Sequence, residues 1–255
     1  MSDRLPESDP GAIVSRFVSS PNHGERRDGR RPDLLLLHYT GMATAEAALK
    51  RLCDPVAEVS AHYLVMEDGA VVQLVPEDRR AHHAGVGSWA GETDINSCSI
   101  GIEIVNPGHD GGLPPYPDGQ ITAVIELGRA IVDHWAIPAE RVLAHSDIAP
   151  SRKEDPGELF PWHRLAEAGI GRWVEPDPPS DAVVLEFGDT GSEVEALQDA
   201  LAFYGYGIEA TGDFDDATRQ VVTAFQRHFR PARVDGMVDD STLAILQTLI
   251  ETRST

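Results

Sequence analysis

Residues 142–162 read VLAHSDIAPSRKEDPGELFPW and combine a short apolar run with a long polar loop. The apolar run ends at His145, and a loop rich in proline, serine and charged residues then leads to Asp155. An imidazole and a carboxylate on one structured loop can supply two ligands of a zinc ion. The stretch therefore predicts a strand that delivers one metal ligand at its end and a loop that delivers a second.

A third ligand has to come from another part of the chain. His38 directly follows the run Leu34–Leu37, which is typical of a buried strand that ends in a polar residue. A catalytic zinc site uses three protein ligands and leaves one position open for water. The set His38, His145 and Asp155 meets this requirement. The chain has 10 histidines, so spacing alone leaves other sets open, and His228 is expected to be an ordinary structural or surface residue.

Strand and helix patterns alternate through residues 33–174. Two apolar runs flank Asp68-Gly69, which indicates a hairpin. Residues 99–105 read SIGIEIV and predict a strand, whereas residues 120–135 carry apolar side chains at helical spacing. This alternation predicts an α/β domain with a central mixed β-sheet flanked by helices.

The two ends of the chain differ from this central part. Residues 1–32 are polar and predict an irregular arm, and residues 175–181 are a proline-rich linker by composition. Within residues 182–255, the segment Gly212-Asp-Phe-Asp-Asp-Ala-Thr218 matches Gly236-Met-Val-Asp-Asp-Ser-Thr242, and each copy precedes a helical pattern. With one earlier helix, this predicts a small three-helix domain that binds a partner and carries no second active site.

Charge and hydropathy exclude several classes of partner. The net charge of −21 argues against nucleic acid and anionic membranes as partners. No apolar run approaches the roughly 20 residues of a transmembrane helix. The first residues lack the apolar stretch of a signal peptide, so we expect a cytoplasmic protein. The cell envelope is the alternative, which an upstream segment would favour.

Two further residues could take part in hydrolysis. Glu103 lies on the same strand face as Ser99 and Gly101, and a carboxylate there needs a polar cavity or solvent to stay charged. It is the best placed candidate for proton transfer, and Lys153 could stabilise an oxyanion. An ordinary solvated or salt-bridged role would also account for Glu103, and chance alone for a lysine at position 153.

Several motifs occur in one order along the chain: strand-His38-Tyr-Thr-Gly, Ser60-Ala-His-Tyr-Leu-Val with Asp68-Gly69, Ala81-His-His-Ala-Gly85, Ser99-Ile-Gly-Ile-Glu-Ile-Val-Asn106, and His145-Ser-Asp-Ile-Ala-Pro-Ser-Arg-Lys-Glu-Asp-Pro-Gly157. Together they closely resemble the type 2 N-acetylmuramoyl-L-alanine amidases, the AmpD/AmiD branch of the peptidoglycan-recognition-protein superfamily. The resemblance covers about residues 33 to 165. The tail, about residues 182 to 251, looks like the peptidoglycan-binding three-helix domain that is often fused to such amidases.

The resemblance implies a role for each matching residue. It implies zinc on His38, His145 and Asp155, Glu103 as general base and acid, Lys153 as oxyanion stabiliser, and His83 and Asn106 as substrate-binding groups. This chain has His82 where the family usually has tryptophan. It also has Ala61 where phage-lysozyme-like relatives have tyrosine, which favours Glu103 as the proton-transfer residue.

The resemblance therefore implies a zinc amidase that cleaves between the lactyl group of N-acetylmuramic acid and L-alanine of the stem peptide. A non-catalytic peptidoglycan recognition protein and a zinc peptidase acting within the stem peptide are the alternatives. The lack of a signal peptide favours recycled muropeptides, such as 1,6-anhydro forms, whereas the binding domain favours polymeric peptidoglycan. We expect recycling.

Overall fold

The computed structural model describes residues 13–175, 177–178 and 181–253. Within these residues the strands are β1 (Arg16–Phe17), β2 (His23–Glu25), β3 (Leu34–Tyr39), β4 (Tyr63–Val65), β5 (Val71–Gln73), β6 (Arg79–Ala81), β7 (Ser99–Ile104), β8 (Val142–Ala144), β9 (Val183–Leu185) and β10 (Val238–Asp239). The α-helices are α1 (Ala45–Leu52), α2 (Ile95–Cys98), α3 (Asp118–Trp135), α4 (His145–Ile148), α5 (Trp162–Glu167), α6 (Ser192–Tyr204), α7 (Asp216–Phe229) and α8 (Asp240–Glu251).

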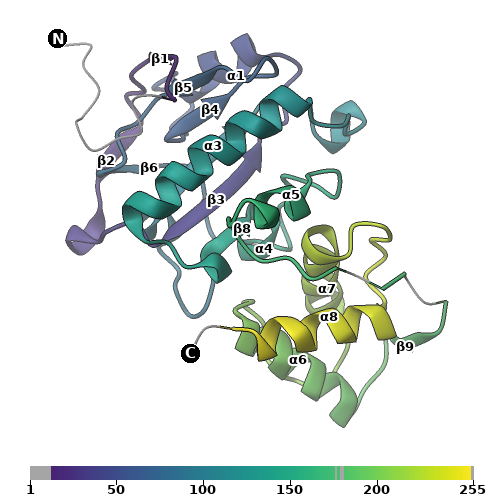
Figure 1. The fold of residues 1–255 in the computed structure, drawn as a ribbon. Helices are drawn as coiled ribbons and strands as arrows, with labels where there is room; N and C mark the ends of the chain where they lie inside the picture. Colours follow the sequence, from purple (N-terminus) through teal and green to yellow (C-terminus); the bar gives the residue numbers. More distant parts are fainter. Residues whose placement is uncertain (1–12, 176, 179–180, 254–255) are drawn as a thin grey trace.

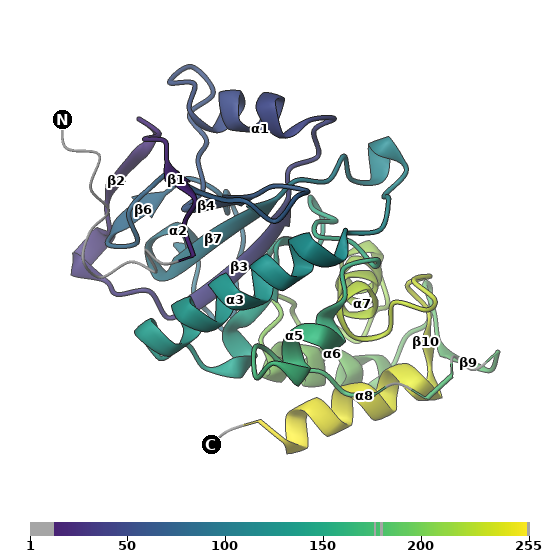
Figure 2. The ribbon, with the colours of Figure 1, turned by 45° about the horizontal axis from the view of Figure 1, so that its top comes forward.

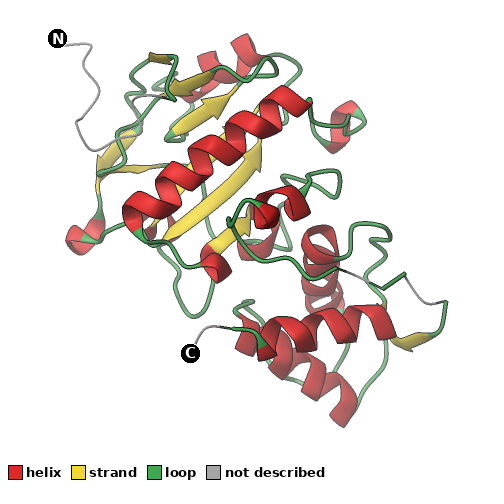
Figure 3. Cartoon of the chain, viewed as in Figure 1, coloured by secondary structure: helices red, strands yellow, loops and turns green. Residues whose placement is uncertain are grey.

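The centre of the fold is a mixed six-stranded sheet with the order β1-β5-β4-β7-β3-β8. Strands β4, β7, β3 and β8 run parallel, and β5 pairs antiparallel with β4 through the predicted hairpin. Helix α3 crosses one face of this sheet (Figures 1 and 3). Its buried side includes Ile121, Val124 and Leu127, which follow the helical spacing seen in the sequence. The predicted α/β fold is confirmed.

Strand β3 is buried on both faces, as its unbroken leucine run predicts. Leu35 and Leu37 pack in the cluster that includes α3. Leu34 and Leu36 pack in a second cluster that includes the C-terminal helices. Strand β3, which carries His38, therefore lies between two hydrophobic layers, which hold its backbone in place.

The N-terminal arm is more regular than predicted. Strand β1 pairs parallel with β5, and β2 pairs antiparallel with β6. The polar side chains that suggested a loop instead satisfy buried backbone groups. The guanidinium of Arg26 donates to the carbonyls of Glu77, Ser97 and Ser99. The prediction of an irregular arm is thus wrong for β1 and β2, and residues 1–12 lie outside the described part.

Residues 181–253 form the C-terminal module, in which α6, α7 and α8 surround a small core (Figure 2). The sequence repeat marks two helix starts. Asp215 Oδ1 accepts the Thr218 N–H at 2.9 Å, and Asp239 Oδ1 accepts the Thr242 N–H at 2.8 Å. The predicted three helices are present, together with the short pair β9–β10. Residues 176 and 179–180 of the predicted linker lie outside the described residues.

The core of the C-terminal module continues into the larger domain. One cluster of buried side chains joins Leu143 and Ile148 to Val221 and Phe225. Figure 1 shows α7 beside α4, close to the loop that follows β8. No helix of the described residues has both the length and the apolar character that crossing a membrane requires.

Candidate metal centre and active site

The register of three parallel strands brings the predicted ligands together. His38 on β3 pairs with Glu103 on β7, so both lie at the same level of the sheet. On the other side of β3, Leu37 pairs with Ala144, which places His145 next to His38. Side chains from neighbouring parallel strands therefore meet at one edge, where α/β folds commonly bind ligands.

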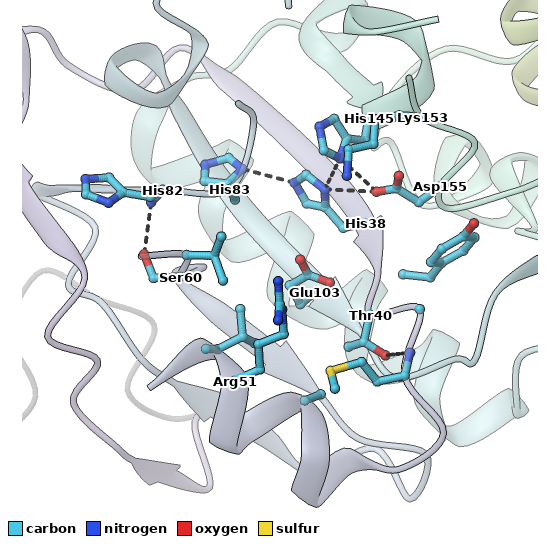
Figure 4. A pocket seen from close by; sticks show the side chains of 16 residues that line it. His38, Thr40, Arg51, Ser60, His82, His83, Glu103, His145, Lys153 and Asp155 are labelled. Atoms are coloured by element: carbon cyan, nitrogen blue, oxygen red, sulfur yellow. Dashed lines mark hydrogen bonds and ion pairs between the residues drawn. The ribbon is translucent and has the colours of Figure 1, made fainter. Parts of the chain in front are cut away.

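His38, His145 and Asp155 converge on one point and are buried (Figure 4). The two Nδ1 atoms lie 2.8 Å apart, and each lies 3.0 Å from Asp155 Oδ2. Two imidazole nitrogens and one carboxylate oxygen form a ligand set that suits a catalytic zinc ion. The residues present therefore fit the metal that the sequence predicts.

A chain of hydrogen bonds orients His38. The Ser99 hydroxyl donates to the Ile95 carbonyl at 2.6 Å, and this uses its one proton. Ser99 Oγ must then accept from His83 Nε2, 3.1 Å away, which leaves His83 Nδ1 as an acceptor. That atom lies 3.0 Å from His38 Nε2. His38 Nε2 therefore carries the proton, and its Nδ1 presents a lone pair to the metal site.

A backbone carbonyl orients His145 in the same way. His145 Nε2 lies 2.9 Å from the Ala84 oxygen, which can only accept, so Nε2 carries a proton. In the neutral ring Nδ1 is then the nitrogen without a proton. Both imidazoles thus direct bare Nδ1 atoms at Asp155. Such outer hydrogen bonds are the usual means by which proteins fix the tautomer of a metal-binding histidine.

The electrostatics of the site favour the protonation state that binds a cation. Burial, and then the neighbouring His145, lower the pKa of His38 to about 4. Burial alone would raise the pKa of Asp155, but the neighbouring His145 and then His38 hold it well below its usual range. Burial also lowers the pKa of His83 well below 6.5. At neutral pH the centre therefore combines a neutral His38 imidazole with the Asp155 carboxylate.

A cavity of about 280 Å³ opens beside this centre. Glu103 and Lys153 line it, and no group of the described residues forms a hydrogen bond with the buried Glu103 Oε2. Burial, and then the negative charge of Asp155, raise the pKa of Glu103 well above its usual range, although Lys153 lowers it in part. Glu103 therefore holds a proton up to a higher pH than an exposed glutamate does, which is a property of proton-transfer groups in active sites.

The two predicted substrate-binding residues have protein partners. Both ring nitrogens of His83 are bonded within the protein, as described above, although its ring reaches the cavity wall. Asn106 donates to the Pro114 carbonyl and accepts from the Gly108 N–H, and it does not line the cavity. The structure thus gathers the other predicted residues around the cavity and places Asn106 in a neighbouring loop.

Sequence reasoning missed Arg51, which also lines the cavity and lies at the end of α1 (Figure 4). The sequence does not predict this role, because Arg51 reaches the cavity only when α1 packs against the rest of the domain. His82, which differs from the usual family residue, also lines the cavity.

Comparison with known proteins agrees with this geometry. Residues 28–158 match the family described as N-acetylmuramoyl-L-alanine amidase. The chain belongs to this family. Residues 190–246 of the amidase match the family described as putative peptidoglycan binding domain.

Curated relatives of the amidase carry related names. It is 38% identical over 237 residues to N-acetylmuramoyl-L-alanine amidase AmiD of Escherichia coli, covering 87% of this chain and 83% of that protein. It is 37% identical over 170 residues to the 1,6-anhydro-N-acetylmuramyl-L-alanine amidase AmpD of the same organism, covering 60% of this chain and 91% of that protein.

Solved structures of similar proteins include complexes. AmiD from E. coli, in complex with anhydro-N-acetylmuramic acid-L-Ala-D-γ-Glu-L-Lys, aligns with a TM-score of 0.74 over 87% of this chain and 89% of that chain. AmpDh3 from Pseudomonas aeruginosa, in complex with an anhydromuramic pentapeptide, is 36% identical and aligns with a TM-score of 0.73. That alignment covers 88% of this chain and 93% of the other. Both alignments extend into the C-terminal module, since they exceed the length of the larger domain.

Proposed function

We propose that the amidase holds one zinc ion on His38, His145 and Asp155 and hydrolyses the amide between the lactyl group of N-acetylmuramic acid and L-alanine. The observation that carries this proposal is the convergence of the three ligand atoms within 3.0 Å of one another, beside Glu103 and Lys153. When bound, zinc lowers the pKa of a coordinated water to about 7 and polarises a carbonyl.

Glu103 has the position and the raised pKa of a proton-transfer group. It lies beside His38 in the strand register and lines the cavity, and its buried Oε2 has no hydrogen-bond partner among the described residues. In its ionised form it takes a proton from the attacking water. It then delivers this proton to the nitrogen of L-alanine, because an amine leaves far more readily than its anion.

Lys153 supplies positive charge where negative charge develops. It lines the cavity next to His145, and no carboxylate of the described residues forms an ion pair with its ammonium group. The carbonyl oxygen of the substrate becomes an oxyanion as water attacks, and a cation held beside it stabilises that state.

His83 acts through His38, because it sets the tautomer of that ring. His83 and Asn106 are also the proposed substrate-side groups at the edge of the site.

We propose 1,6-anhydro-muropeptides as a substrate form. The complexes of AmiD and AmpDh3 with anhydromuramic peptides support this choice, because both proteins are similar to the amidase over most of its length. A cytoplasmic location would suit such recycled fragments. The match to a peptidoglycan binding domain supports a second substrate, the polymeric wall, which would instead require the cell envelope.

Digestion of two substrates tests the proposal. Zinc-loaded protein is incubated with anhydro-muropeptides and with intact sacculi, and mass spectrometry identifies the products, with Glu103→Gln protein as control. An amidase releases a stem peptide that begins with L-alanine and has a free amino terminus. Release from the muropeptide alone supports recycling, and release from sacculi supports wall turnover. Fragments cut within the stem would indicate a peptidase, and binding without products would indicate a recognition protein.

A further inference from the structure

Asp147 is a wholly buried carboxylate that lies two residues after His145. It accepts three hydrogen bonds. The Ala144 N–H donates to its Oδ2 at 2.8 Å, His228 Nδ1 lies 2.7 Å from the same oxygen, and the Tyr206 hydroxyl donates to Oδ1 at 2.7 Å. Both His228 and Tyr206 belong to the C-terminal module, so two of these three bonds cross between the two parts of the chain.

The turn that Asp147 stabilises carries a proposed metal ligand. By accepting the Ala144 N–H, Asp147 closes the first turn of α4, which begins with His145. The same turn is tied to the other end of the loop, because the Ser146 N–H donates to the Asp155 carbonyl at 3.1 Å. The position of Asp147 therefore affects His145 and Asp155 together.

The C-terminal module also contacts the remainder of this loop. Arg227 forms an ion pair with Glu154 at 2.7 Å, next to Asp155. The ring of His228 stacks on Trp162, with ring centroids 3.8 Å apart and an angle of 23° between the planes. Helix α7, which carries Arg227 and His228, thus contacts Asp147, Glu154 and the first residue of α5, Trp162.

These contacts differ from those of an independent binding module. Interfaces between separable domains are usually more polar and solvated, and they permit relative motion. Here a buried carboxylate would keep one hydrogen bond of three if the module moved away. A buried charge that loses its partners is strongly destabilising, so the loop and the module must stay together or rearrange together.

We propose that the C-terminal module is a structural part of the metal centre. Tyr206 and His228 are positioning residues that act through Asp147 to hold residues 145–155 in the geometry that binds zinc. This inference rests on the proposed zinc site. It gives the module a second role besides the proposed binding of peptidoglycan.

Tyr206→Phe in the full-length chain tests this role, because it removes one hydroxyl and keeps the ring. Tyr204→Phe is the matched control. Tyr204 is buried in the same turn and packs on Trp89, as Tyr206 does, but its hydroxyl bonds to no described residue. Zinc affinity is measured by competition with a chromophoric chelator. Exchange of backbone amides in residues 145–155 is measured on the metal-free protein.

We expect Tyr206→Phe to raise the dissociation constant for zinc about fivefold to tenfold, because the loop then spends only a fraction of its time in the binding geometry. The Ser146 amide should also exchange faster. Tyr204→Phe should change neither quantity. His228→Leu should have a larger effect of the same kind, and Tyr206→Phe keeps the test valid if that variant does not fold.

Equal zinc affinity and equal loop exchange in Tyr206→Phe, Tyr204→Phe and the wild type would overturn the inference. A fall in melting temperature alone would show only that the module packs on the domain. Absence of zinc binding by the wild-type chain would overturn the metal site and this inference together. A wild-type chain that binds zinc but shows no amidase activity would contradict the proposed function and leave this inference standing.

Discussion

Replacing His83 with phenylalanine should weaken zinc binding, although His83 is not a proposed ligand. His38 can bind a metal through Nδ1 only while its Nε2 carries a proton, and His83 Nδ1 accepts that proton at 3.0 Å. Phenylalanine fills a similar volume but accepts no such bond. The metal-free variant can then move the proton to His38 Nδ1, where Asp155 Oδ2 accepts it at 3.0 Å. Zinc binding then has to move this proton back from Nδ1 to Nε2 of His38.

The size of the effect follows from the cost of that reversal. In the zinc-bound variant the Nε2–H of His38 is a buried donor without a partner, which costs about 1–3 kcal/mol. Since about 1.4 kcal/mol corresponds to a factor of ten, the dissociation constant for zinc should rise about 5-fold to 150-fold. Loss of outer partners of metal ligands usually costs about 10-fold to 100-fold, which agrees with this range.

Competition with a chromophoric chelator measures the affinity, and His82→Phe is the matched control. His82 is the adjacent residue and lines the same cavity, but its ring has no hydrogen bond to the described residues. Ser99→Ala, which breaks the next bond of the chain, should give a smaller loss than His83→Phe. Unchanged affinity in His83→Phe, or an equal loss in His82→Phe, would refute the role of this hydrogen-bond chain.

Three further predictions concern the chemistry and the stability. Glu103→Gln should lower the rate of stem-peptide release by about 10²- to 10⁴-fold and keep zinc bound, as metal analysis and product mass spectrometry would show. Asp155→Ala should lose zinc on dialysis together with activity; retention of both would contradict the ligand set. His62 is buried, and burial followed by the charge of Arg26 lowers its pKa to about 3. Below pH of about 6.5 only the unfolded chain protonates this ring, so unfolding free energy should fall by about 1.4 kcal/mol per pH unit down to about pH 3. Denaturant titrations at pH 7 and pH 5 should show a smaller fall for His62→Gln, and an equal fall would contradict this cause.

The positions that the sequence predicts correctly depend on local patterns. The leucine run before His38 and the alternation around Glu103 identify two strands, and parallel pairing then places both residues at one level of the sheet. The repeat before α7 and α8 identifies two helix starts, because an aspartate at that position caps the helix. Each of these features acts over a few residues, so it leaves a pattern that can be read from the sequence.

The features that the sequence does not reveal depend on distant contacts or on the backbone. Asp147 lies in the motif that follows His145, but its partners Tyr206 and His228 are 59 and 81 residues away. The tautomers of His38 and His145 depend on the carbonyls of Ile95 and Ala84. Every residue has a backbone carbonyl, so the sequence does not show which carbonyls take this role. The ordered N-terminal strands escaped prediction for a related reason, since polar side chains there bond to buried carbonyls.

Those two carbonyls belong to one segment, residues 81–98, which supplies none of the proposed ligands. The segment nevertheless orients both imidazoles, one directly and one through Ser99 and His83. It is held in turn by the C-terminal module, because the Ala90 N–H donates to the Gly205 carbonyl at 2.7 Å and Trp89 packs on Tyr206. The module therefore contacts both segments that orient the ligands, the 81–98 segment and the α4 turn. If the proposed zinc site is correct, we therefore expect the affinity for zinc to depend on how these three parts of the chain pack together. Three ligands placed on equivalent strands alone should then bind zinc more weakly.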